Sequence, residues 1–255
     1  MTTERIEHDP VEWFREHFED AADKVISFLG EDGIELAGKQ VADVGCGDGV
    51  IDLGVALKGR PARLVGYDIR PTDPDALVRA ARAAGVAEEL PDSLEFQTSS
   101  VEGLPAEDDS FDVVFTWSAF EHVSNPVALL ADIRRVLRDD GCLFLQLWPF
   151  FHSEHGGHLW IHYDDPFPHL TRDDATIVEE LKGKRATDPS RPAEDEYRSL
   201  NLLTLDELQR ALLVNGLLVT KLHLLTETIH VPPRLAHIPL SLVGVGGVEL
   251  LAVPR

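Results

Sequence analysis

The chain of 255 residues has only two cysteines and no long apolar segment. Cys46 follows a predicted strand within a glycine-rich turn and Cys142 lies in an expected buried strand, so they do not suggest a disulfide framework. No apolar run approaches the roughly 20 residues that a membrane-spanning helix needs. The first residues also lack the basic start and apolar core of a secretory signal. We therefore expect a cytoplasmic protein with no membrane partner.

Basic residues are scarce as well. The chain has 23 Lys and Arg against 45 Asp and Glu, a formal net charge of −22. Nucleic-acid binding depends on neutralising phosphates with Lys and Arg, and no cluster of these residues is present, so we expect no nucleic-acid partner. The acidity fits a solvated surface. The length suits one large α/β domain, and the sequence carries no signal for an oligomeric state.

Strands and helices alternate through residue 148. Apolar strands are expected at 39–44, 63–68, 94–98, 111–117 and 142–148, with helices at 10–29, 50–58, 73–84 and 126–137. This alternation predicts βαβ units and a parallel sheet of the Rossmann-like, doubly wound α/β class. After residue 200, Thr204 and Glu207 form a capping box for a helix to about residue 215, and strands are expected at 217–225 and 247–253. Residues 171–199 show little periodicity, and no element is predicted there.

A glycine-rich turn directly follows the first strand. Gly45, Gly47 and Gly49 stand at every second position before a predicted helix. Glycine permits unusual backbone angles, and a strand–turn–helix brings N–H groups against a bound molecule. The spacing differs from the dinucleotide pattern G-x-G-x-x-G. Asp68 ends the second strand 19 residues after Gly49, close to the roughly 20-residue spacing of a ribose-binding carboxylate.

Four segments in order resemble the class I S-adenosylmethionine-dependent methyltransferases, especially the small-molecule branch: residues 41–49, 65–68, 100–105 and 110–114. The resemblance implies a seven-stranded sheet, parallel except for an antiparallel last strand, and S-adenosylmethionine as cofactor. It implies these cofactor-binding residues: Asp43, Gly45, Cys46, Gly47, Asp68, Ile69, Ser100, Val101, Trp117 and His122. Ser100 replaces the usual Asp, but a hydroxyl can also accept a hydrogen bond from the adenine amino group.

We expect a single methyltransferase domain with four parts. Residues 1–37 carry the N-terminal helix, which packs on the core or covers the site as a lid; packing is the expected role. Residues 38–148 form the cofactor-binding core, 149–200 an acceptor-side insertion with a lid or loop after strand five, and 201–255 the C-terminal helix and strands.

The insertion contains five histidines within 18 residues, at positions 152, 155, 158, 162 and 169. Methyl transfer requires alignment of acceptor and donor, and a hydroxyl acceptor also requires a base. Histidine suits that role because its pKa lies near neutrality. We expect the base among His155, His158 and His122, with Phe151, His152 and Trp160 contacting the acceptor. The segments 156–159 and 166–170 resemble methyltransferases of glycan and natural-product gene clusters.

Other interpretations of these residues remain open. His122 could be a helix-start residue that supports cofactor packing. The insertion could be structural, or it could bind a divalent metal through several of His152, His155, His158, His162 and Asp164. Imidazole suits zinc, nickel or iron, but Gly156 and Gly157 oppose the helix that would align the histidines. A divalent metal is thus possible but not favoured, and no metal ligand is assigned.

Methyl transfer from S-adenosylmethionine to a small-molecule substrate is therefore the expected function. The expected acceptor is a hydroxyl of a sugar or glycosylated metabolite in natural product biosynthesis. The alternatives are N- or C-methylation of another small metabolite, a non-catalytic module that binds the cofactor or a metal, and a nicotinamide-dependent dehydrogenase.

Overall fold

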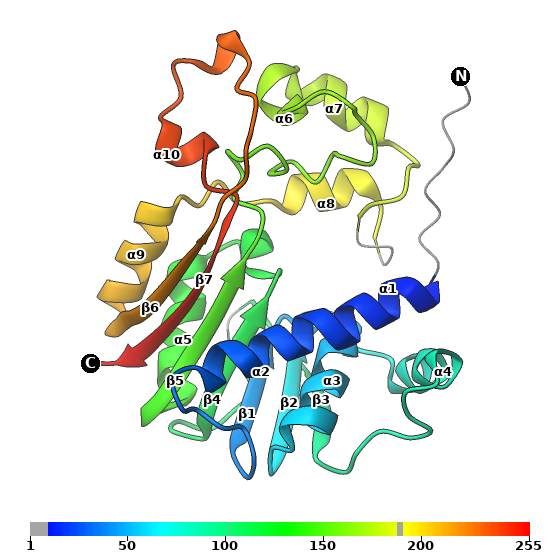
Figure 1. Ribbon diagram of the computed structural model, residues 1–255, viewed down its shortest axis with the longest axis vertical. Helices are drawn as coiled ribbons and strands as arrows, with labels where there is room; N and C mark the ends of the chain where they lie inside the picture. The colour runs from blue at the N-terminus through cyan, green and yellow to red at the C-terminus, as the bar shows by residue number, and fades with distance from the viewer. Residues whose placement is uncertain (1–9, 102, 188–190) are drawn as a thin grey trace.

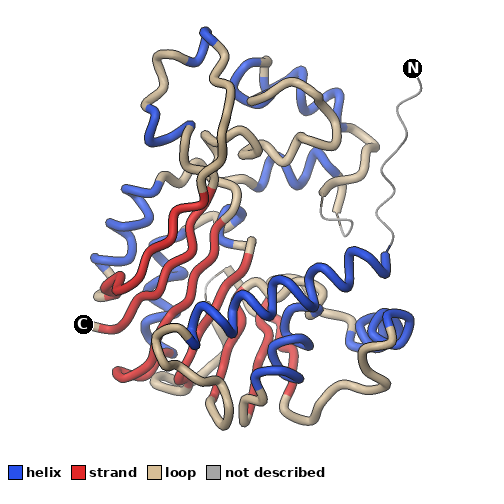
Figure 2. Tube along the Cα trace, in the orientation of Figure 1, coloured by secondary structure: helices blue, strands red, loops and turns tan. Residues whose placement is uncertain are grey.

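A seven-stranded sheet forms the centre of the protein (Figures 1 and 2). The computed structural model describes residues 10–101, 103–187 and 191–255. The strand order is β3-β2-β1-β4-β5-β7-β6, and β7 runs antiparallel to both of its neighbours while the other pairs are parallel. This confirms the predicted Rossmann-like sheet with an antiparallel last strand.

The strands have the following bounds: β1 (Gln40–Val44), β2 (Arg63–Asp68), β3 (Leu94–Thr98), β4 (Phe111–Trp117), β5 (Leu137–Leu147), β6 (Leu217–Leu225) and β7 (Gly247–Pro254). Side chains alternate between the two faces of the sheet. One face packs on α2 (Ala22–Gly30), α3 (Val50–Gly59) and α4 (Pro74–Ala84), and the other packs on α5 (Pro126–Val136) and α9 (Leu205–Val214). The sheet therefore has an apolar core on each side.

The N-terminal helix consists of three consecutive segments. α1 (Pro10–Glu16) continues through a π-helical turn, η1 (His17–Ala21), into α2. Its apolar side chains, including Phe14 and Phe18, belong to the core on the α3 face. Gly54 of α3 allows the close approach, because a Cβ there would lie 2.6 Å from the Cβ of Ala22. This helix packs on the core.

The start of β5 differs from the prediction, which placed a helix at 126–137 and began the strand at residue 142. α5 ends at Val136, and β5 begins at Leu137, which pairs with Phe111 before the register shifts to the Val113–Cys142 pair. Gly141 lies within the strand, where a Cβ would be 2.8 Å from the carbonyl oxygen of Asp112. Glycine is needed here because two backbone segments approach closely inside the strand. In the sequence alone, a glycine at this position resembles a turn residue.

A cap lies beyond the carboxyl ends of the parallel strands, at the top of Figure 1. We use "cap" for the insertion 149–200 together with the connection 226–246. It contains the following helices: α6 (Pro168–Thr171), α7 (Asp174–Leu181), α8 (Ala193–Ser199), η3 (Pro233–Leu235) and α10 (Leu240–Val243). Leu159, Ile177 and Tyr197 belong to a separate apolar cluster within the insertion, and Phe167, Leu235 and Val243 form another.

Among the described residues, no helix combines the length and the apolar character that crossing a bilayer requires.

Candidate active site

The three glycines of the turn after β1 all have positive φ angles, of 92°, 55° and 79° at Gly45, Gly47 and Gly49. A Cβ at Gly45 would lie 2.4 Å from the Cβ of Ala119, and one at Gly49 would lie 2.5 Å from the ring of Phe96. Substitution at either position would therefore strain the backbone and force neighbouring groups apart. The turn brings its backbone close to the segment that follows β4.

Asp68, the last residue of β2, forms a hydrogen bond to the turn that follows β1. Its Oδ2 accepts a hydrogen bond from the backbone N–H of Gly47 at 3.0 Å, and its Oδ1 accepts one from the N–H of Arg70 at 2.8 Å. Ile69 and Val101 lie beyond the ends of β2 and β3 and are 62% and 77% exposed. Exposed apolar side chains beside a fixed carboxylate suit a ligand with a flat ring and ribose hydroxyls.

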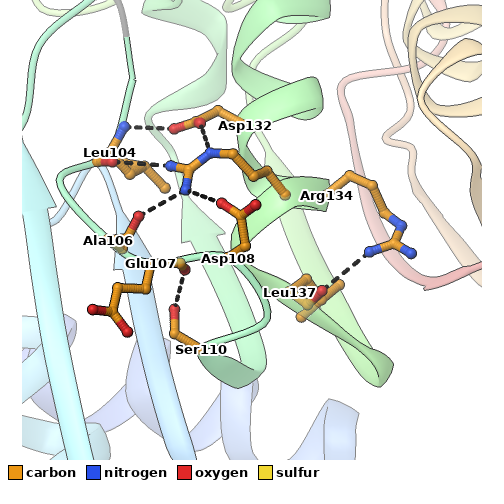
Figure 3. A network of polar contacts seen from close by, with 9 residues as sticks. Leu104, Ala106, Glu107, Asp108, Ser110, Asp132, Arg134 and Leu137 are labelled. Atoms are coloured by element: carbon orange, nitrogen blue, oxygen red, sulfur yellow. Dashed lines mark hydrogen bonds and ion pairs between the residues drawn. The ribbon is translucent and has the colours of Figure 1, made fainter.

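Ser100 lies just beyond β3 and pairs through its backbone with Gly103 at 3.2 Å in both directions. The segment that follows is fixed to α5 by the guanidinium of Arg135, whose hydrogen-bond partners are labelled in Figure 3. This group donates to the carbonyl oxygens of Leu104 and Ala106 at 3.1 and 2.7 Å, and to carboxylate oxygens of Asp132 and Asp108 at 2.7 and 2.8 Å. Arg135 therefore fixes the position of the segment after β3, which is expected to contact the adenine ring.

Three ionisable groups lie buried beneath the glycine turn. Burial, followed by the charge of Asp52, raises the pKa of Asp43 well above its usual range. Burial also raises the pKa of Asp52 to about 7 and raises the pKa of the Cys46 thiol. Cys46 is therefore not a thiolate nucleophile. The side chains of Asp43 and Cys46 are buried, whereas Gly45 and Gly47 are partly exposed.

The end of β4 contacts the end of β5 through one buried side chain. The amide oxygen of Gln146 accepts hydrogen bonds from the backbone N–H of Ser118 at 2.8 Å and from its hydroxyl at 3.0 Å. Trp117, the last residue of β4, has its ring centroid 6.3 Å from that of Phe144. Gln146 also belongs to the lining of a pocket. This one side chain therefore lies between the pocket and the end of β4.

The pocket has a volume of about 480 Å³ and lies between β5, β6 and the cap. His155 and Trp148 belong to its lining, and their ring centroids are 5.9 Å apart. Trp160 lies 5.4 Å from Trp148 and 5.6 Å from His155. The structure therefore brings His155 and Trp160 together beside a pocket that the sequence did not locate.

The ring of His158 lies between those of Trp160 and His122 in a chain of ring contacts. The ring centroids of His158 and Trp160 are 5.3 Å apart, and those of His158 and His122 are 5.2 Å apart. Burial, with a smaller contribution from Arg191, lowers the pKa of His122 to about 2, so its imidazole is neutral. The neighbouring Glu121 is buried, and this raises the pKa of its carboxyl group to about 8.

Phe151 and His152 form a third group of rings with His169. The Nε2 of His169 lies 2.6 Å from the carbonyl oxygen of Phe151, whose ring centroid is 5.1 Å from the His169 ring and 5.6 Å from the His152 ring. Neither Phe151 nor His152 is among the residues that line the pocket. The expected acceptor residues are therefore divided between two places.

A set of paired polar residues on three neighbouring strands was not predicted from the sequence. Gln146 of β5 pairs with Glu249 of β7, which pairs with His223 of β6. Glu249 is buried, and its Oε2 lies 2.8 Å from the Nδ1 of His223, which lines the pocket. A charged residue within the otherwise apolar segment 247–253 was the available signal, because such a group is buried only with a partner.

The comparisons with known proteins agree with this arrangement. Residues 42–145 match a family model described as a methyltransferase domain. Residues 42–145 are therefore similar to methyltransferase domains, and they carry strands β1 to β5 of the seven-stranded sheet.

Individual relatives cover the same core. The chain is 36% identical over 113 residues to a ubiquinone biosynthesis O-methyltransferase of Xanthomonas oryzae pv. oryzae, and this match spans only 44% of the chain and 44% of that enzyme. An S-adenosylmethionine-dependent methyltransferase of Mesorhizobium loti has a TM-score of 0.56 at 16% identity, covering 93% of this chain and 100% of that one.

A third relative is geranyl diphosphate C-methyltransferase of Streptomyces coelicolor A3(2), whose structure contains Mg²⁺, geranyl-S-thiolodiphosphate and S-adenosyl-L-homocysteine. It has a TM-score of 0.57 at 15% identity, covering 91% of this chain and 76% of that one. At these identities the two structures show a shared fold.

Proposed function

We propose that the protein transfers a methyl group from S-adenosylmethionine to a hydroxyl group of a small, polyhydroxylated acceptor such as a sugar or glycosylated metabolite. The observation that carries this proposal is the position of Gln146, which contacts Ser118 at the end of β4 and also lines the pocket under the cap. The acceptor pocket and the cofactor-binding edge of the sheet are thereby adjacent.

The ends of β1, β2 and β3 support binding of the methyl donor. The glycine turn presents backbone beside Asp68, and a carboxylate in this position can accept hydrogen bonds from two ribose hydroxyls. Ile69 and Val101 offer exposed apolar surface for the adenine ring. The matched methyltransferase domain covers Gly45, Gly47, Asp68 and Ser100.

The lining of the pocket supports a polyhydroxylated acceptor. Gln146, Ser153, Glu154 and Thr226 are hydrogen-bonding residues in that lining, and Trp148 adds an aromatic ring. Such a mixture suits a molecule with many hydroxyl groups and an apolar face. The relatives named as O-methyltransferases also favour an oxygen acceptor. In this proposal His155 accepts the hydroxyl proton while the oxygen attacks the methyl carbon, and the sulfonium leaves as the neutral thioether.

Binding and turnover are tested separately. Isothermal titration with S-adenosylmethionine should show one site, and incubation with a panel of sugars and glycosides should yield a methylated hydroxyl. His155→Ala should leave cofactor affinity unchanged and lower kcat about 100- to 10,000-fold, because a positioned base contributes that much. His237→Ala, at an exposed position elsewhere in the cap, is the matched control.

Cofactor binding without methylation of any hydroxyl acceptor would contradict the proposed reaction. Full turnover by His155→Ala would show that another group accepts the proton.

A further inference from the structure

Glu121, His122 and His158 come together although they belong to different parts of the chain. Glu121 and His122 form the end of η2 (Phe120–His122), just after β4, and His158 comes from the cap. Each residue offers one ligand atom, and these atoms lie within 4.8 Å of one another. Glu121 is only 2% exposed, and neither oxygen of its carboxylate has a hydrogen-bond partner in another described residue. A buried carboxyl group whose oxygens lack such partners indicates a ligand, because burying polar atoms without a partner is costly.

The hydrogen bonds around His122 define which ring nitrogen carries the proton. Its Nδ1 lies 2.8 Å from the hydroxyl oxygen of Ser199. That hydroxyl donates its single proton to the carbonyl oxygen of Glu196 at 2.7 Å and accepts from Arg191 at 3.2 Å. Ser199 therefore accepts from His122, whose Nδ1 is the protonated nitrogen, and the lone pair lies on Nε2.

The same reasoning applies to His158. Its Nδ1 lies 3.2 Å from the hydroxyl oxygen of Thr187, and this hydroxyl donates to the carboxylate of Glu196 at 2.7 Å. Thr187 thus accepts from His158, and the lone pair of His158 also lies on Nε2. Histidines that bind metals through one nitrogen usually donate the other N–H to an oxygen that fixes the ring. Both histidines have this arrangement.

We propose that Glu121, His122 and His158 form a binding site for a divalent transition-metal ion, with Zn²⁺ as the preferred ion. A set of two imidazoles and one carboxylate binds zinc in preference to magnesium. Three protein ligands leave the fourth tetrahedral position of zinc for an oxygen ligand. Small shifts of roughly 1 Å would bring the three atoms to the usual zinc bond lengths of about 2.0–2.2 Å. The guanidinium of Arg191 lies 4.0 Å from the carboxylate of Glu196, which balances its charge.

This site differs from the metal site considered for the histidine-rich insertion. Of the candidates His152, His155, His158, His162 and Asp164, only His158 belongs to the cluster. The other two ligands come from the segment after β4. The proposal does not depend on the methyl acceptor, because it concerns metal binding by the protein alone.

The test is metal content and affinity of the tag-free, full-length protein. Elemental analysis after zinc loading and desalting should give one equivalent of zinc. After chelation, titration with Co²⁺ should produce visible ligand-field bands that zinc abolishes. Glu121→Gln and His158→Gln should each lose this site. Thr187→Val should retain it with affinity about 10- to 100-fold weaker, because a group that orients a metal-bound histidine commonly has that effect. His155→Gln is the matched control.

Absence of stoichiometric zinc and of cobalt bands in the native protein would overturn the proposal. Metal binding that persists unchanged in His158→Gln and Thr187→Val would do the same, even if Glu121→Gln fails to fold. Cofactor affinity, measured in parallel by titration with S-adenosylmethionine, separates a failure of this proposal from a failure of the proposed methyl transfer.

Discussion

At the scale of a single residue, Asp68 combines a structural contact with an expected contact to the cofactor. Its carboxylate holds the N–H of Gly47 in the glycine turn, and it lies where the ribose of the cofactor is expected. Asp68→Ala should therefore weaken S-adenosylmethionine binding by about 1–3 kcal/mol, through loss of charge-assisted hydrogen bonds. Isothermal titration measures this change.

A nearby carboxylate provides the control for Asp68. Asp73 caps α4 and accepts hydrogen bonds from the N–H groups of Asp75 and Ala76. Asp73→Ala should lower stability by about 1 kcal/mol while leaving cofactor affinity unchanged. Equal affinity of Asp68→Ala and the native protein would show that the ribose binds elsewhere.

At the scale of an element, α5 determines the position of the segment that follows β3. Arg135 makes four hydrogen bonds to that segment and to Asp132 and Asp108. A lysine has a single ammonium group and cannot reproduce this forked geometry. Arg135→Lys should lower the free energy of unfolding by about 1–2 kcal/mol and weaken cofactor binding several-fold.

Arg134 is the matched control for this prediction, since it lies on the same helix and donates instead to the carbonyl oxygen of Leu137 (Figure 3). Arg134→Lys should leave cofactor affinity unchanged in the same titration. If both variants bind the cofactor like the native protein, the segment does not depend on α5 for its position.

At the scale of the whole molecule, buried carboxyl groups within one core make stability depend on pH. Burial raises the folded-state pKa of Asp52 to about 7 from an ordinary 3.8. Below about pH 4 both states are protonated. Between pH 4 and 7 the unfolded chain loses this proton while the folded protein keeps it, so stability falls as pH rises, and above pH 7 the penalty remains.

Asp52→Asn removes this penalty. Its free energy of unfolding relative to the native protein should rise across pH 4 to 7, by up to about 4 kcal/mol, because the pKa rises from 3.8 to about 7 and each pKa unit corresponds to about 1.4 kcal/mol. Denaturant unfolding at several pH values measures the difference. Substitution of the exposed Asp92 by asparagine should leave the profile unchanged. A pH-independent effect of Asp52→Asn would show that its carboxyl group is not shifted.

Local patterns accounted for most of the sheet. Strands such as β4 are short apolar runs bounded by turn residues, and Gly45 to Gly49 form the expected turn, because both features depend on neighbouring residues. The start of β5 could not be predicted in this way, since Leu137 is a strand residue only through its pairing with Phe111. α7 and α8 were also missed, because each is short and buries few side chains.

The candidate site could be predicted only in part, because some of its residues meet only through tertiary contacts. Asp68 ends a recognisable strand, so its position followed from the parallel sheet. The meeting of His122 with His158 depends on how the cap folds, and nothing in the spacing of two residues 36 positions apart indicates it. Charged residues inside apolar segments, such as Glu121, were the informative local signal.

The cap has its own apolar clusters, separate from the two cores that enclose the sheet. Substitutions there can reshape the pocket without disturbing the glycine turn or Asp68. In the proposed reaction, substitutions in the cap would therefore change the acceptor while leaving the expected donor site intact. Exchange of residues 149–200 together with 226–246 is the unit of such redesign, because both apolar clusters then lie within the exchanged segments.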